Sequence, residues 1–203
     1  NKGNEPMRVV TNDAITVKTG EAAGTITASV YPARANQNVT FTAEGDVTIE
    51  QNGNKCTVTA NNHTLNPTTA IVTATASNGI KNKTVVTVEP KIEDAPTFTK
   101  EPTVNVSNGT INVDYALDLG VASKDTSLIT WYRCDDAEGN GAIAIADSKM
   151  DTPTKSYTLC EGDIGKYIKM VIAPDSELSK VGDTVTVMYT TPITADDVTS
   201  ANI

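Results

Sequence analysis

The feature that most constrains this chain is a two-residue alternation of apolar and polar side chains in short segments separated by turn residues. In "GTITASVYP" the residues Ile26, Ala28 and Val30 share one face, and "NVTFTA" repeats the alternation. Because side chains of a strand point alternately to its two faces, this pattern predicts strands with one face in a core. No window has an apolar stripe of helical period. The chain is therefore expected to be all-β, in sandwiches or barrels.

The length of 203 residues accommodates two ordinary domains. The clearest break is "VEPKIEDAP" at 88–96, where prolines bracket charged residues, a composition typical of a short, stiff linker. We expect one β-sandwich over residues 1–91 and a second over residues 92–203. The last segment, "TADDVTSANI", has no strand pattern and is interpreted as a C-terminal connector.

In the first block, "DVTIEQNGNKCTVTA" predicts a hairpin that turns at Asn52-Gly53, and "AIVTATASNGIKNKTVVTV" predicts two strands around Asn78-Gly79. These stretches, together with "ASVYPARANQNVTFTAEG", resemble the group 2 bacterial Ig-like domains of adhesins and intimin-type proteins. The resemblance implies an Ig-like sandwich. Phe41 stands where that family usually has tryptophan, so the resemblance implies the fold and not adhesion.

The second block contains "INVDYAL", "LITWYRC", "SYTLCEGDIGKYIKMVIAP" and "DTVTVMYTTP". It is similar to the Ig-like repeats appended to bacterial polysaccharide lyases, glycoside hydrolases and surface-anchored proteins. The residues that carry the similarity are Trp131, Tyr157-x-Leu159, Asp163-x-Gly165-Lys166, Pro174 and Gly182. The resemblance implies a second sandwich, so the whole chain is expected to be two tandem immunoglobulin-like β-sandwich domains.

The motif Asp163-x-Gly165-x-Tyr167 is also typical of the corner that precedes the second cysteine of an antibody domain, but Lys169 stands at the cysteine position. A strand phase that buries Tyr167 also buries Lys169, and an unpaired buried ammonium group costs several kcal/mol. The other phase buries three aliphatic side chains, Ile168, Met170 and Ile172. Since each is worth about 1.5–3 kcal/mol when buried, we expect Tyr167 and Lys169 outside and no antibody corner.

The same map places two tyrosines on one outer face. Tyr132 has the opposite parity to the inward Trp131, and Tyr167 points outward on the neighbouring strand. We therefore predict a small ligand-binding platform of Tyr132 and Tyr167, with Lys169 or Arg133 nearby, for a polysaccharide. The alternative is two incidental surface tyrosines or a contact with an adjoining domain, because isolated exposed aromatics are common.

A calcium site is a second hypothesis. In "DDAEGNGAIAIAD" the residues Asp136, Glu138, Asn140 and Asp147 occupy positions 1, 3, 5 and 12 of an EF-hand-like loop. The loop has Glu at position 3, the shorter Asp at position 12, and no flanking helices. The alternative is the polar turn of a hairpin followed by the strand "AIAIA", with no cofactor bound.

The three cysteines include a pair that could form a disulfide. Cys134 ends one strand and Cys160 begins a connection at the same pole of an Ig-like sandwich, so a bridge fits if their Cα atoms lie within about 7 Å. The sequence leaves the bridge open. Cys56 shares the face of Val58 and Ala60 and is expected to be a buried, small apolar residue.

Composition and motifs argue against several functions. A net charge of −9 and a pI near 4.6 disfavour nucleic acid and anionic membranes as partners, and no apolar run approaches the roughly 18 residues of a membrane span. His63 is the single histidine, no G-x-S-x-G motif occurs, and the close acidic pairs lie in expected turns. We expect no enzyme and a monomer.

Three classes of function stay open at this point. The first is a spacer or adhesion unit of a bacterial secreted or cell-surface protein, accessory to polysaccharide binding or degradation. The second is a carbohydrate-binding module, and the third is an enzyme, for which the sequence offers no candidate set. The expected partners are a polysaccharide or a neighbouring catalytic domain.

Overall fold

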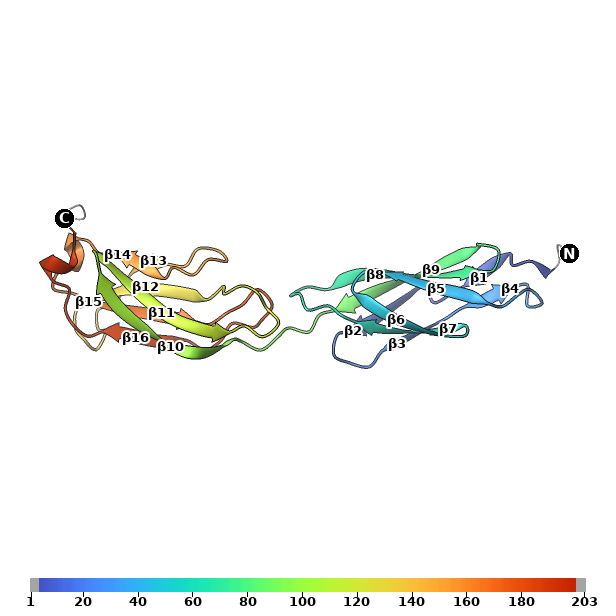
Figure 1. Cartoon of the computed structure of the whole chain (residues 1–203), viewed down its shortest axis with the longest axis horizontal. Helices are drawn as coiled ribbons and strands as arrows, with labels where there is room; N and C mark the ends of the chain where they lie inside the picture. The colour runs from blue at the N-terminus through green and yellow to red at the C-terminus, as the bar shows by residue number, and fades with distance from the viewer. Residues whose placement is uncertain (1–3, 200–203) are drawn as a thin grey trace. The chain divides into compact units, whose positions relative to one another are not determined.

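The computed structural model describes residues 4–199, which form two compact units divided between Ile92 and Glu93. Each unit is built of β-strands (Figure 1). The division after Ile92 lies one residue beyond the boundary expected from the sequence. Within residues 4–199, no helix has the length and apolar character needed to cross a membrane.

The first unit is a sandwich of two main sheets. Its described strands are β1 (Arg8–Val10), β2 (Ala14–Lys18), β3 (Gly24–Thr27), β4 (Ser29–Tyr31), β5 (Val39–Glu44), β6 (Val47–Asn52), β7 (Lys55–Ala60), β8 (Thr68–Ala76) and β9 (Lys81–Glu89). One sheet has the order β2–β9–β8–β5 and the other β3–β7–β6, and β1 pairs with β4. In the four-stranded sheet, β2 and β9 are the first and last strands in chain order, and they pair in parallel. The other strand pairs are antiparallel.

The predicted hairpins of this unit are confirmed. β6 and β7 pair in register from Val47 opposite Ala60 to Asn52 opposite Lys55, so the turn is formed by Gly53 and Asn54, one residue later than predicted. The alternating apolar residues of both sheets meet in one core, which includes Ile26, Phe41, Cys56, Val58, Val72 and Val86. Cys56 is fully buried, as expected for a small apolar side chain.

The second unit packs a three-stranded sheet, β10–β11–β14, on a four-stranded sheet, β13–β12–β15–β16. The strands are β10 (Thr97–Ser107), β11 (Thr110–Asp118), β12 (Leu128–Cys134), β13 (Ile143–Asp147), β14 (Ser156–Thr158), β15 (Tyr167–Ala173) and β16 (Val185–Tyr189), with 3-10 turns η2 (Glu161–Asp163) and η3 (Ala195–Asp197). All of these strand pairs are antiparallel.

The predicted phase of β15 is confirmed. Its aliphatic residues Ile168, Met170 and Ile172 are at most 1% exposed and pack with the fully buried Trp131, whereas Lys169 lies on the opposite, half-exposed face. Gly165, in the turn before the strand, has φ +79°, a conformation that side chains with a Cβ rarely adopt. The alternation of apolar side chains therefore determined which face of the strand entered the core.

The segment interpreted as a connector is part of the second sandwich. Val198, within this segment, and Ile193, directly before it, are 4% and 1% exposed and belong to its core. Ile193 also exchanges two backbone hydrogen bonds with the turn before β15, to Gly165 and Lys166. Two separated apolar residues give no strand signal, which is why sequence periodicity missed this contribution. Residues 200–203 of the predicted connector lie outside the described part of the chain.

Candidate functional site

The outer face of β12 and β15 carries the three predicted platform residues. Tyr132 and Lys169 are directly opposite each other in the ladder, and Tyr167 lies opposite Cys134, two residues along the same face. Lys169 Nζ lies 4.8 Å from the centroid of the Tyr132 ring, a cation–π distance. All three predicted residues are half-buried. The ammonium group thus occupies one side of the Tyr132 ring, on which a sugar would otherwise stack.

The β12–β13 connection folds over this same face. A methyl group added at Gly139 would lie 3.4 Å from Lys169 Cδ and 3.5 Å from Met188 Sδ, so the loop backbone passes close to β15 and β16. Cys134 has the outward parity of Tyr132 but is only 1% exposed. Burial raises the pKa of the Cys134 thiol, and the nearby Lys169 charge partly offsets that increase.

The structure does not assemble the predicted calcium loop. The Asp136 carboxylate accepts hydrogen bonds from the amides of Glu138 and Asn140, at 3.1 and 3.0 Å, and from Asn140 Nδ2 at 2.8 Å. The bonds from Asn140 lower the pKa of Asp136 most. Asp147 ends β13 and accepts from Thr130 Oγ1 at 3.1 Å. Within residues 4–199, no group of three or more His, Cys, Asp or Glu side chains could hold a metal ion. The Asp136 carboxylate instead shapes the turn between β12 and β13.

The disulfide that the sequence left open is not formed. Cys56, Cys134 and Cys160 are free thiols. Cys134 lies on the outer side of β12, whereas Cys160 Sγ accepts from Arg133 Nη2 at 3.6 Å and lies 3.8 Å from the Tyr157 hydroxyl. Successive residues of a strand point to opposite faces, so Cys134 and Arg133, the neighbour of Cys160, are on different sides of the sheet.

The sequence allowed Arg133 to lie near Tyr132 and Tyr167, but the structure places it on the other side of the sheet. Its Nε donates to Asp163 Oδ1 at 2.7 Å, and Asp163 is fully buried. Asp163 Oδ2 also accepts from the Tyr157 hydroxyl and the Cys160 amide, both at 2.9 Å. The hydrogen bond to Asp163 raises the pKa of Arg133, and burial, followed by the bond to Asp163, raises the pKa of Tyr157.

Sequence reasoning missed this buried cluster, although a signal was present. Arg133 has the parity of the inward Trp131, and a charged residue on a core-facing phase requires a buried partner of opposite charge. The Asp163 carboxylate also accepts a hydrogen bond from the backbone amide of Cys160. Its second and third donors come from β12 and β14, so the carboxylate connects the two sheets of the second unit.

A separate hollow, of about 310 Å³, lies on the outer face of β5, β8 and β9 in the first unit. Thr42, Thr73 and Lys83 form one row across the three strands, and Thr75 and Lys81 form the next row. Glu44 and Ile71, which are also opposite each other, line the same hollow. Residues that are scattered in the sequence thus form a polar surface with two ammonium groups, which no local motif indicated.

The strand order and registers of both units define the class of protein: this is an all-β chain of two tandem Ig-like sandwiches, a class of fold that includes fibronectin type III domains. No protein-family model matches the sequence, and no curated protein matches it. Several solved structures are similar to the chain, but their TM-scores are low. The fold is therefore assigned from the strand order and pairing of the two units.

One of these structures is the crystal structure of DIP-gamma IG1+IG2, with 10% identity and a TM-score of 0.36, covering 91% of this chain and 96% of that one. Another is Dpr11 IG1 bound to DIP-gamma IG+IG2, with 8% identity, a TM-score of 0.38, and coverage of 89% and 96%. A third is chicken CNTN1 FN1-FN3, with 13% identity, a TM-score of 0.32, and coverage of 92% and 65%.

Proposed function

We propose that the chain is a pair of non-catalytic Ig-like modules of a bacterial secreted or cell-surface protein. In this proposal they act as a spacer or adhesion unit, accessory to polysaccharide binding or degradation, with a polysaccharide or a neighbouring catalytic domain as partner. The bacterial assignment and the location rest on the resemblance of both blocks to bacterial Ig-like domains. Nucleic acid is disfavoured as a partner by the net charge of −9.

The observation that carries the spacer role is the pairing of terminal strands in the first unit. β2 and β9 run parallel, from Ala14 opposite Val85 to Lys18 opposite Glu89. Because the two strands run parallel, the chain enters β2 at one end of the ladder and leaves β9 at the other end. Once the short β1–β4 pair has yielded, a pull on the two ends of the unit therefore slides β2 along β9. The hydrogen bonds of the ladder then share the load instead of breaking one at a time, which suits a module under tension.

Force spectroscopy on the whole chain, pulled from its two ends, tests this role. The second unit is an internal comparison, because its first and last strands, β10 and β16, lie in different sheets. We expect the first unit to unfold at the higher force. The two unfolding steps can be told apart by contour length, since the units differ in size. A first unit that yields at the same or a lower force would contradict the spacer proposal.

Two proline variants isolate the ladder itself. The bonds at its ends use the carbonyl of Asp13 and the amide of Thr19, so odd-numbered residues of β2 face β9. Ile15→Pro removes a donor that faces β9 and is expected to lower the unfolding force of the first unit toward that of the second. Thr16→Pro is the matched control, because its amide faces away from the ladder. Equal effects of the two variants would show that the ladder does not bear the load.

A second candidate function is a carbohydrate-binding module. It is favoured by the position of Tyr132, Tyr167 and Lys169 on one outer face. In this proposal Lys169 swings off the Tyr132 ring when a sugar stacks there. The double variant Tyr132→Ala/Tyr167→Ala should then lose retention on columns of plant or host glycans that retain the wild type. Identical retention of the two proteins would remove this candidate.

A further inference from the structure

The hollow on β5, β8 and β9 is lined by two lysines, Lys81 and Lys83. Lys81 and Lys83 are exposed, and within residues 4–199 neither forms an ion pair with a carboxylate. They lie on the same face of β9, two residues apart, which separates their Cα atoms by about 6.6 Å. Glu44, also exposed, is the one acidic residue that lines the hollow.

The charge of the whole chain is distributed very unevenly between the units. Residues 1–92 contain eight Lys or Arg and seven Asp or Glu, a formal charge of +1, whereas residues 93–203 contain eight and eighteen, a formal charge of −10. An anionic ligand is therefore repelled by the second unit and meets its best electrostatic complement on the first. This location is distinct from the tyrosine face of β12 and β15.

We propose that this hollow is a binding site for an acidic polysaccharide, one that carries carboxylate or sulfate groups. Lys81 and Lys83 bind two successive anionic groups of the glycan. The hydroxyls of Thr42, Thr73 and Thr75 each donate and accept hydrogen bonds, which matches the hydroxyls and ring oxygens of sugar residues. The site goes beyond the spacer role and can be absent while that role holds.

The chemistry of the hollow favours a glycan over an acidic peptide. Interfaces with protein partners are enriched in aromatic residues at their centre. None of the residues that line this hollow is aromatic, and Ile71 is its one large apolar side chain. Each row of the hollow combines threonine hydroxyls with one lysine ammonium group. This arrangement matches a polysaccharide in which every sugar unit carries both hydroxyl groups and an anionic group.

The test is an NMR titration of the ¹⁵N-labelled full chain with hexagalacturonate at about 10 mM salt, where the Debye length is about 30 Å. We expect chemical-shift changes on β5, β8 and β9. The double variant Lys81→Gln/Lys83→Gln should weaken binding about tenfold, since it removes two exposed charge pairs and each is worth up to about fivefold in affinity. Glu44→Gln should tighten it about two- to fivefold, because the change removes a repelling carboxylate.

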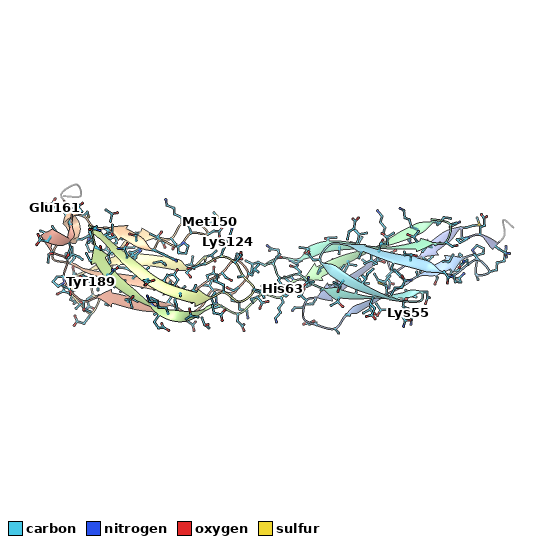
Figure 2. All side chains as sticks on the ribbon, in the orientation of Figure 1. Lys55, His63, Lys124, Met150, Glu161 and Tyr189 are labelled. Carbon is cyan, nitrogen blue, oxygen red and sulfur yellow. The ribbon has the colours of Figure 1, made fainter. Side chains whose placement is uncertain are left out.

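Matched controls separate this site from general charge effects. Lys55→Gln and Glu50→Gln alter exposed charges on β7 and β6, in the other sheet of the same unit (Figure 2 labels Lys55), and should leave binding unchanged. Methyl-esterified hexagalacturonate should not bind, and a sulfated hexasaccharide tests whether sulfate replaces carboxylate. Shift changes confined to β12 and β15, a Lys55→Gln effect equal to that of the double variant, or equal binding of hexaglutamate would each overturn the proposal. The force measurement is unaffected by any of these outcomes, so the two proposals fail separately.

Discussion

At the scale of single residues, the second unit depends most on the Asp163 carboxylate. It is fully buried and accepts from Arg133 Nε, the Tyr157 hydroxyl and the Cys160 amide. Removing a carboxylate from such a site leaves a guanidinium and a hydroxyl without their partner in a poorly solvated environment. The bonds therefore matter less for their net energy than for the cost of leaving the donors unpaired.

We predict that Asp163→Ala lowers the free energy of unfolding of the second unit by about 3–5 kcal/mol, the range for breaking a buried ion pair. Asp114→Ala is the matched control. It removes the carboxylate of the exposed Lys100–Asp114 pair on β10 and β11, and it should cost less than about 1 kcal/mol. Urea denaturation followed by Trp131 fluorescence measures both, because the only tryptophan lies in this unit. Similar losses in the two variants would contradict a structural role for the buried cluster.

At the scale of elements, a carboxylate pins the β11–β12 connection to the β15–β16 connection. Glu177 Oε1 accepts from the Ser123 amide and hydroxyl at 2.7 and 2.9 Å, and its Oε2 accepts from the Lys124 amide at 2.9 Å. Partial burial raises the pKa of Glu177, but the hydrogen bonds together outweigh burial and lower the pKa to about 2. The ionised form therefore holds the two loops together.

The acid stability of the second unit should depend on this contact. Because the pKa of Glu177 is lower in the folded state than the ordinary value of 4.5, its contribution is fully present above pH 4.5 and is lost as the pH falls toward 2. We predict that Glu177→Gln makes urea midpoints, measured from pH 6 to about pH 3, less dependent on pH. Glu101→Gln on the exposed face of β10 is the control. If the urea midpoint of Glu177→Gln depended on pH as strongly as that of the wild type, Glu177 would not hold the two loops together.

Sequence periodicity was sufficient for the strands whose two faces differ strongly. The phase of β15 followed from three aliphatic residues against one lysine, and the hairpin β6–β7 followed from alternation on both sides of Asn52-Gly53, although its turn lies one residue later. Such features depend on neighbours in the chain. The contact between Arg133 and Asp163, and the rows of threonine and lysine on β5, β8 and β9, depend on which strands become neighbours in space. No local pattern encodes that pairing.

Buried polar residues show the same limit. Asn62, in the connection between β7 and β8, is 1% exposed. Its side-chain amide donates to the Val88 and Asn66 carbonyls at 2.9 and 2.8 Å, and its Oδ1 accepts from the Thr64 amide at 2.9 Å. An asparagine that closes the end of a sandwich is indistinguishable in sequence from one in a solvated turn, because the difference lies entirely in its long-range partners.

At the scale of the whole molecule, the chain has two separate cores. One is built from side chains of β1–β9 and the other from side chains of β10–β16 with the C-terminal segment. Each core contains a fully buried aliphatic residue, Ile26 in the first and Met170 in the second, that can be truncated to alanine. Two closed cores within one chain lead us to expect two cooperative transitions rather than one.

Scanning calorimetry of Ile26→Ala and Met170→Ala tests this expectation. Either truncation should lower the free energy of unfolding of its own unit by about 2–5 kcal/mol. A loss of about 1 kcal/mol lowers the melting temperature of a domain of this size by roughly 4–8 °C. We predict that each variant lowers one transition by about 10 °C or more and leaves the other in place. Lys169→Ala, next to Met170 but on the outer face of β15, should leave both transitions near their wild-type temperatures. If both transitions moved together in either core variant, the sandwiches would have to share their stability, and a mechanical unit of two independent modules would no longer describe the chain.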